Sequence, residues 1–174
     1  VPMVLLLVLT QVAAQPVISE FVAANEASLL DGDGQSSDWI EIYNGGPPID
    51  LVGWHMTDNP GDLTKWQVAS SLPLGAGDFV VVFASGRASQ PYVDALGYHH
   101  ANFRIDLSGE YLALVAPDGT NVVSVFTNVP AQVTDHAFGL VWEPGSGTSN
   151  LLEHATITAL VPTNGLLGST WTSI

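Results

Sequence analysis

Closely spaced aspartates in residues 31–38 are the strongest candidate for chemistry in this sequence. The segment reads Asp31-Gly32-Asp33-Gly34-Gln35-Ser36-Ser37-Asp38. Calcium takes roughly six to eight oxygen ligands, and clustered carboxylates with nearby backbone carbonyls supply them. We therefore predict Asp31, Asp33 and Asp38 as candidate metal ligands, and calcium as the candidate cofactor if the chain has one at all.

The same segment also fits a solvated loop that binds no cofactor. A calcium loop of the EF-hand type would carry a bidentate glutamate where this chain has Ile42, and its glycine would stand at a different position. Asp-Gly pairs are also frequent turn formers. The spacing leaves both interpretations open.

The sequence lacks the common patterns of catalysis. It has no cysteine, which excludes thiolate metal sites and cysteine nucleophiles. His99 and His100 are adjacent, so on a strand they would point to opposite faces and would not share one zinc ion. Ser85 ends an apolar run, but no Gly-x-Ser-x-Gly elbow is present. We predict no catalytic residues, and therefore a protein that is not an enzyme.

The charge balance limits the classes of partner. Acidic residues outnumber basic ones 17 to 3, and the formal net charge is −14. Lys65, Arg87 and Arg104 are too few to form the basic surface that a nucleic-acid backbone requires. Nucleic acid is therefore a disfavoured partner, and the acidity favours solubility.

Three aromatic residues are candidates for contacting a partner. Tyr92, Tyr98 and Trp142 fall in or beside segments that are expected to be loops. Exposed aromatic side chains of this kind contact proteins and glycans, although they equally serve as packing caps over the ends of a sandwich. The sequence does not name the partner.

Many short apolar runs separated by turn residues predict an all-β fold. No stretch keeps helical periodicity over three turns, and turns recur about every 8–12 residues, as in sandwiches and barrels. The uniformly apolar run at 79–84 is typical of a central strand. The expected strands span residues 17–24, 38–44, 51–57, 65–69, 79–84, 101–106, 110–116, 122–128, 136–142 and 151–158.

An ordered series of motifs in residues 16–128 resembles the lamin tail domain family in its bacterial secreted form. The series includes Asp38-Trp39-Ile40-Glu41-Ile42-Tyr43-Asn44, then Leu51-Val52-Gly53-Trp54, and later Gly109-Glu110-Tyr111-Leu112. The resemblance implies an immunoglobulin-like antiparallel β-sandwich that acts as a binding or spacer module, with no catalytic residues to carry over. Physical reasoning gives the aromatic residues of these motifs a structural role in the core: Trp39, Tyr43, Trp54 and Trp66.

The ends of the chain differ in character from its middle. Residues 1–15 combine a short apolar run with Val12 and Ala14 at signal-peptidase spacing, which predicts a secretory signal. The run holds about ten apolar residues, whereas a membrane span needs roughly 20. We expect one domain over 16–158, and a linker or the start of a following module over 159–174.

These observations predict a non-catalytic, secreted or cell-surface module of a larger multidomain protein, which serves as a spacer or binds a protein or glycan. The alternative prediction is a calcium-dependent accessory domain of an extracellular hydrolase.

Overall fold

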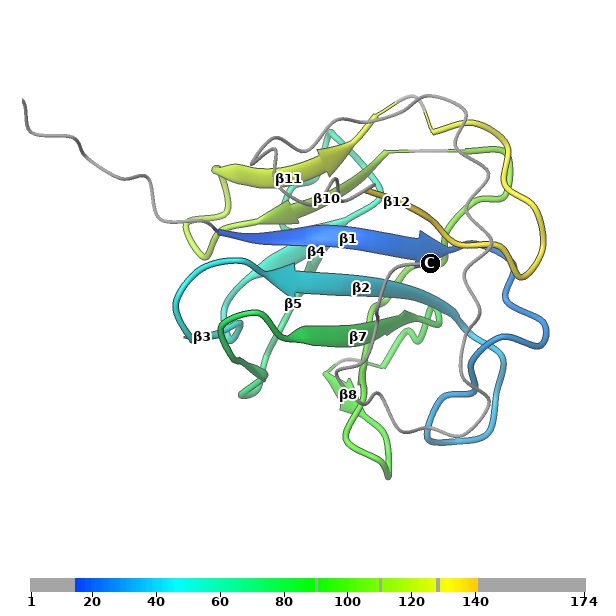
Figure 1. Cartoon of the computed structure of the whole chain (residues 1–174), viewed down its shortest axis with the longest axis horizontal. Coiled ribbons are helices and arrows are strands. Elements are labelled where there is room, and N and C mark those ends of the chain that lie inside the picture. Colours follow the sequence, from blue (N-terminus) through cyan, green and yellow to red (C-terminus); the bar gives the residue numbers. More distant parts are fainter. Residues whose placement is uncertain (1–14, 90, 110, 128, 141–174) are drawn as a thin grey trace, which may run out of the picture.

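Two β-sheets pack face to face and enclose the core of this chain (Figure 1). The computed structural model describes residues 15–89, 91–109, 111–127 and 129–140. Within these residues every regular element is a strand, and no helix is long and apolar enough to cross a membrane. The predicted signal segment, the strand expected at 151–158 and the segment 159–174 lie outside the described residues.

The larger sheet has six strands and the smaller one has four, with a further two-stranded ribbon. In spatial order, the larger sheet holds β12 (Phe138–Gly139), β1 (Pro16–Val22), β2 (Asp38–Asn44), β7 (Phe79–Ala84), β9 (His99–His100) and β8 (Tyr92–Val93). The smaller sheet holds β11 (Val122–Phe126), β10 (Leu112–Val115), β4 (His55–Thr57) and β5 (Trp66–Gln67). The ribbon pairs β3 (Ile49–Asp50) with β6 (Pro73–Leu74). All pairings are antiparallel except that of β7 with β9.

Alternation along β2 sets which side chains enter the core. Ile40 and Ile42 are fully buried between the sheets, because successive side chains of a strand point to opposite faces. The intervening Trp39, Glu41 and Tyr43 lie on the outer face. Their neighbours on β7 follow the same rule, since Val82 belongs to the core between the sheets and Phe83 to the outer face.

A β-bulge in β1 lets two residues three positions apart enter the same core. Ile18 pairs with Ile42 and Glu20 with Glu41, so Ser19 is the extra residue. An extra residue reverses the alternation of side chains, and Phe21 therefore points inward as Ile18 does. Phe21 packs edge-on against Phe126, with ring centroids 5.4 Å apart.

The four aromatic residues expected in the core are divided between two faces. Trp54 and Trp66 are buried between the sheets. Trp39 is 3 % exposed, but it belongs to a separate cluster on the outer face of the larger sheet. Tyr43 is only half-buried, with its ring 4.8 Å from that of Phe79. The expectation of one aromatic core is therefore corrected, because Trp39 and Tyr43 share the outer face of β2.

The strand expected at 101–106 is irregular in the structure, and the strand in this region is β9 just before it. Ala101, Phe103 and Ile105 are buried in alternation, which is the pattern that suggested a strand. Their backbone groups, however, bond to the ends of other strands. Ile105 N donates to the carboxylate of Asp38 at 3.2 Å, and Gly86 N donates to the carbonyl of Phe103 at 3.0 Å. One side-chain carboxylate and isolated backbone bonds take the place of a regular strand ladder here.

Candidate functional site

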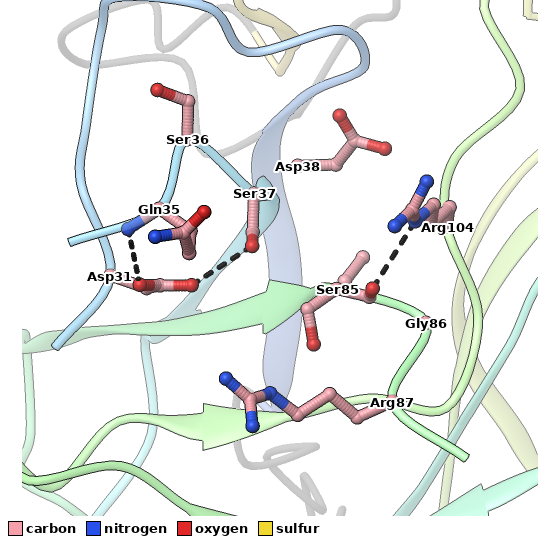
Figure 2. Close-up of a pocket in the computed structure, with 10 residues that line it drawn as sticks. Asp31, Gln35, Ser36, Ser37, Asp38, Ser85, Gly86, Arg87 and Arg104 are labelled. Carbon is pink, nitrogen blue, oxygen red and sulfur yellow. Dashed lines mark hydrogen bonds between the residues drawn. The ribbon is translucent and has the colours of Figure 1, made fainter. Parts of the chain in front are cut away.

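A polar pocket lies where β7 ends beside the loop that precedes β2 (Figure 2). Its volume is about 490 Å³, and its walls are part of the 31–38 loop, residues 84–87 and Arg104. Arg87 and Arg104 are the only arginines of the chain, and both line it. The pocket therefore gathers two of the three basic residues of a protein whose net charge is −14.

Asp31 organises the loop that forms one wall of the pocket. Its side chain is buried, and Oδ1 accepts hydrogen bonds from the backbone N–H of Asp33 at 3.1 Å and of Gln35 at 2.8 Å. Oδ2 accepts the hydroxyl of Ser37 at 2.9 Å (Figure 2). Three donors thus hold this carboxylate, as is usual for an aspartate that closes a turn.

Asp33 belongs to the same loop but does not line the pocket, and it forms a salt bridge with Arg87. The same carboxylate accepts the hydroxyl of Tyr92 at 2.7 Å, which raises the pKa of that phenol. The guanidinium of Arg87 lies 3.9 Å from the centre of the Tyr92 ring, within cation–π range. Tyr92, predicted as a partner contact, is therefore held against Arg87 at the edge of the pocket.

Asp38 lines the pocket from the first residue of β2. Its oxygens accept backbone N–H groups of Asn25 at 3.3 Å and Ile105 at 3.2 Å. Burial raises the pKa of Asp38, although these hydrogen bonds and the nearby Arg104 oppose the rise.

The structure brings two of the three predicted metal ligands, Asp31 and Asp38, to one pocket, while Asp33 turns to Arg87. Within the described parts of the chain, no three His, Cys, Asp or Glu side chains are grouped to hold a metal ion. Calcium binding by this loop stays a prediction. The protein donors that already contact these carboxylates, and the arginines beside them, would compete with a cation for their oxygens.

Gly86 allows Arg104 to lie across the rim of the pocket. Gly86 has φ +70°, and a Cβ there would come 3.0 Å from Cγ of Arg104. Nε of Arg104 donates to the carbonyl of Ser85 at 3.2 Å (Figure 2). Among the described residues, no carboxylate forms a salt bridge with Arg104, and the side chain is exposed.

Ser85, His100 and Asp94 form a hydrogen-bonded chain that sequence reasoning missed. Nδ1 of His100 lies 2.9 Å from the Ser85 hydroxyl, and Nε2 lies 3.1 Å from Oδ2 of Asp94. Because an ionised carboxylate only accepts, Nε2 carries a proton, and in a neutral imidazole Nδ1 accepts the hydroxyl of Ser85. Burial tends to raise the pKa of Asp94, but bonds from His100, Tyr98, Gly32 and Leu96 outweigh it and lower that pKa.

This order of groups resembles the catalytic triad of serine hydrolases, but the surroundings differ. A triad needs backbone donors aimed at the developing oxyanion. The backbone N–H of Gly86, next to the Ser85 hydroxyl, already bonds the carbonyl of Phe103. His100 has no exposed surface. Ser85 is therefore held in the pocket wall by His100, without a free backbone donor from Gly86 beside its hydroxyl.

Of the other two predicted contact residues, Tyr98 does not line this pocket. Tyr98 packs edge-on against Phe83, with centroids 5.1 Å apart, and covers the outer cluster that contains Trp39. Trp142 lies outside the described residues. The available sequence signal for the pocket was Ser85-Gly86-Arg87, where a glycine and a cation follow a buried strand.

Comparison with known proteins assigns the chain to a family. Searches of curated proteins and of solved structures find no match. The model of the Lamin Tail Domain family matches residues 10–129, which is more than half of the 174-residue chain. The two-sheet architecture agrees with the immunoglobulin-like fold of that family, which is non-catalytic. The chain belongs to the Lamin Tail Domain family.

Proposed function

We propose that this chain is a non-catalytic binding module, secreted or displayed at the cell surface, within a larger multidomain protein. The observation that carries the proposal is the polar pocket whose walls are held by hydrogen bonds and whose rim carries both arginines. A preformed pocket with fixed polar groups is the usual form of a binding site. Membership of a non-catalytic family supports binding over catalysis.

The extracellular location rests on the first 15 residues. Their apolar run, followed by Val12 and Ala14, has the pattern of a secretory signal. Fusion of residues 1–20 to a reporter enzyme tests this part directly. Export and cleavage of the reporter would support it, and retention of an uncleaved reporter would contradict it.

A binding screen tests the module itself. The purified chain is applied to arrays of glycans and of peptides, and every hit is repeated with Tyr92→Ala and Arg104→Gln. We expect at least one glycan or peptide to bind, and at least one of the two variants to weaken that binding. Lys65→Gln is the control, because it removes one positive charge from a residue that does not line the pocket and that pairs with Asp58 instead. If nothing binds, the chain acts only as a spacer.

A calcium-dependent accessory domain of an extracellular hydrolase is the second candidate, and Asp31 and Asp38 in one pocket favour it. Binding to the folded state alone adds about 2.7 kcal/mol at one hundred times the dissociation constant. The thermal midpoint of the chain with calcium would then exceed that with chelator by several degrees. Equal midpoints would remove this candidate, and magnesium serves as the control ion.

A further inference from the structure

The pocket at the end of β7 carries one positive charge that nothing in its lining neutralises by direct contact. Arg87 is neutralised by its salt bridge with Asp33. The carboxylates of Asp31 and Asp38 are held by the donors described above, and neither forms a salt bridge with an arginine in the described part of the chain. Arg104 is therefore the available cation.

The guanidinium of Arg104 is oriented as well as available. Contact with Gly86 and the bond from Nε to the carbonyl of Ser85 fix the side chain at its base. Figure 2 shows the guanidinium turned across the pocket toward Asp38 and Ser37. The planar fork of a guanidinium matches a carboxylate, which accepts two parallel hydrogen bonds.

The rest of the lining fits a ligand rich in hydroxyl groups. Ser36, Ser37, Ser85 and Gln35 line a space in which Ala84 is the one apolar side chain. The three serine hydroxyls are hydrogen-bonded to the carbonyl of Glu26, to Asp31 and to His100, which leaves oxygen lone pairs for a ligand. These oxygens can accept hydrogen bonds from sugar hydroxyls, and the amide of Gln35 can both donate and accept. The volume of about 490 Å³ is within the usual range for small-ligand sites.

Charge limits the group that enters the pocket to one with a single negative charge. The two lining carboxylates repel a doubly charged group such as a phosphate monoester, whereas one carboxylate balances the one available cation. We propose that this pocket binds a uronic acid residue of a glycan, with Arg104 holding its carboxylate and the serine and Gln35 side chains contacting its hydroxyls. This inference rests on the proposed binding function and names its ligand class.

The experiment compares two forms of one oligosaccharide. Trigalacturonate and its fully methyl-esterified form share the sugar and differ in the carboxylates, and each is titrated into the full chain by calorimetry at low salt. We expect trigalacturonate to bind at least roughly 10-fold more tightly than the ester, because charge-assisted hydrogen bonds are lost on esterification. Inorganic phosphate is titrated in parallel and should bind more weakly than trigalacturonate.

Two variants assign the binding to the pocket. Arg104→Gln should weaken trigalacturonate binding by roughly 10-fold or more, and Lys65→Gln, with the same change in net charge, should leave it within about 2-fold. Unchanged thermal midpoints show that both variants remain folded. Equal binding of the ester, tighter binding of phosphate, or equal affinity of Arg104→Gln would overturn the proposal. An array hit that does not depend on Arg104 would keep the binding function and reject this ligand class.

Discussion

Nε2 of His100 lies 3.1 Å from Oδ2 of Asp94, and neither side chain is exposed to solvent. The carboxylate also accepts the backbone N–H of Gly32 at 2.6 Å and that of Tyr98 at 3.0 Å. One buried group thus ties the acidic loop to the hairpin formed by β8 and β9. A Cβ at Gly32 would come 2.3 Å from this carboxylate, so the close approach requires glycine.

The first prediction follows from this shared acceptor. Asp94→Asn keeps the shape of the side chain but removes the negative charge to which several N–H groups donate. An amide hydrogen of the new asparagine would also face one of these hydrogen-bond donors. We expect the free energy of unfolding to fall by about 2–4 kcal/mol, since losing one partner of a buried pair is costly. Urea unfolding measures it. Glu26→Gln removes the same charge from an exposed side chain and should change stability by less than about 0.5 kcal/mol; equal losses in both variants would contradict the role of Asp94.

The second prediction concerns Ser85, which has a triad-like partner but lacks a free backbone donor beside it. We expect a fluorophosphonate probe to leave Ser85 unlabelled, because a hydroxyl without a preorganised oxyanion site is not an efficient nucleophile. Intact-mass analysis of the full chain after incubation is the measurement. A covalent adduct that appears on the wild type and disappears in Ser85→Ala would contradict this prediction and show that Ser85 is a reactive nucleophile.

The third prediction is a dependence of stability on pH through Glu20. Burial and the facing carboxylate of Glu41 raise the pKa of Glu20 to about 7. The folded state therefore keeps a proton that the unfolded state loses above about pH 4.5. This contribution to stability is complete below that pH and is lost as the pH rises toward 7.

Glu20→Gln removes the titration and isolates this contribution. At pH 8 the variant should be more stable than the wild type by about 1–3 kcal/mol, and the difference should shrink toward zero at pH 4. Urea unfolding at pH 4, 6 and 8 measures the profile. Asp118→Asn is a control whose effect on the pH dependence of stability should have the opposite sign, because backbone hydrogen bonds from Asn121 and Thr120 lower the pKa of Asp118. Parallel profiles for Glu20→Gln and the wild type would contradict the pKa of Glu20.

The sequence predicts strands well where turns bound a clear pattern, and less well where a bulge or a side chain intervenes. The bounds of β2 and β7 match the expected 38–44 and 79–84, because each run has apolar residues bounded by loop residues. The bulge at Ser19 leaves no comparable signal, since both faces of β1 carry apolar residues. Trp39 could not be assigned to the inner or the outer face of the sheet, because both faces of β2 also carry apolar or aromatic residues.

The pocket is harder to predict than the strands because its walls meet only in the folded chain. The acidic loop resembles a cation site in sequence, yet its carboxylates already bind protein donors. Asp31 binds nearby donors such as Gln35 N, whereas Asp33 binds the distant Arg87. The contact between Arg104 and Gly86 depends on how an irregular segment crosses the end of β7. No rule based on the spacing of residues in the sequence predicts the contact between these two residues.

The last prediction separates backbone strain at Gly86 from its contact with Arg104. Gly86 has φ +70° and Gly77 has φ +80°, so an alanine is strained at both positions. A Cβ at Gly86 meets the side chain of Arg104, whereas a Cβ at Gly77 has nothing within 4 Å. Gly86→Ala and Gly77→Ala should each lower the free energy of unfolding by about 1–2 kcal/mol.

Only Gly86→Ala should also displace the guanidinium of Arg104 from its place over the pocket. We therefore expect Gly86→Ala to weaken trigalacturonate binding roughly as much as Arg104→Gln does, by about 10-fold, and Gly77→Ala to bind as the wild type does. Calorimetry at a temperature where both variants are folded makes the comparison. Equal binding by the two alanine variants would mean that Gly86 serves only the turn after β7, and that the position of Arg104 does not depend on it.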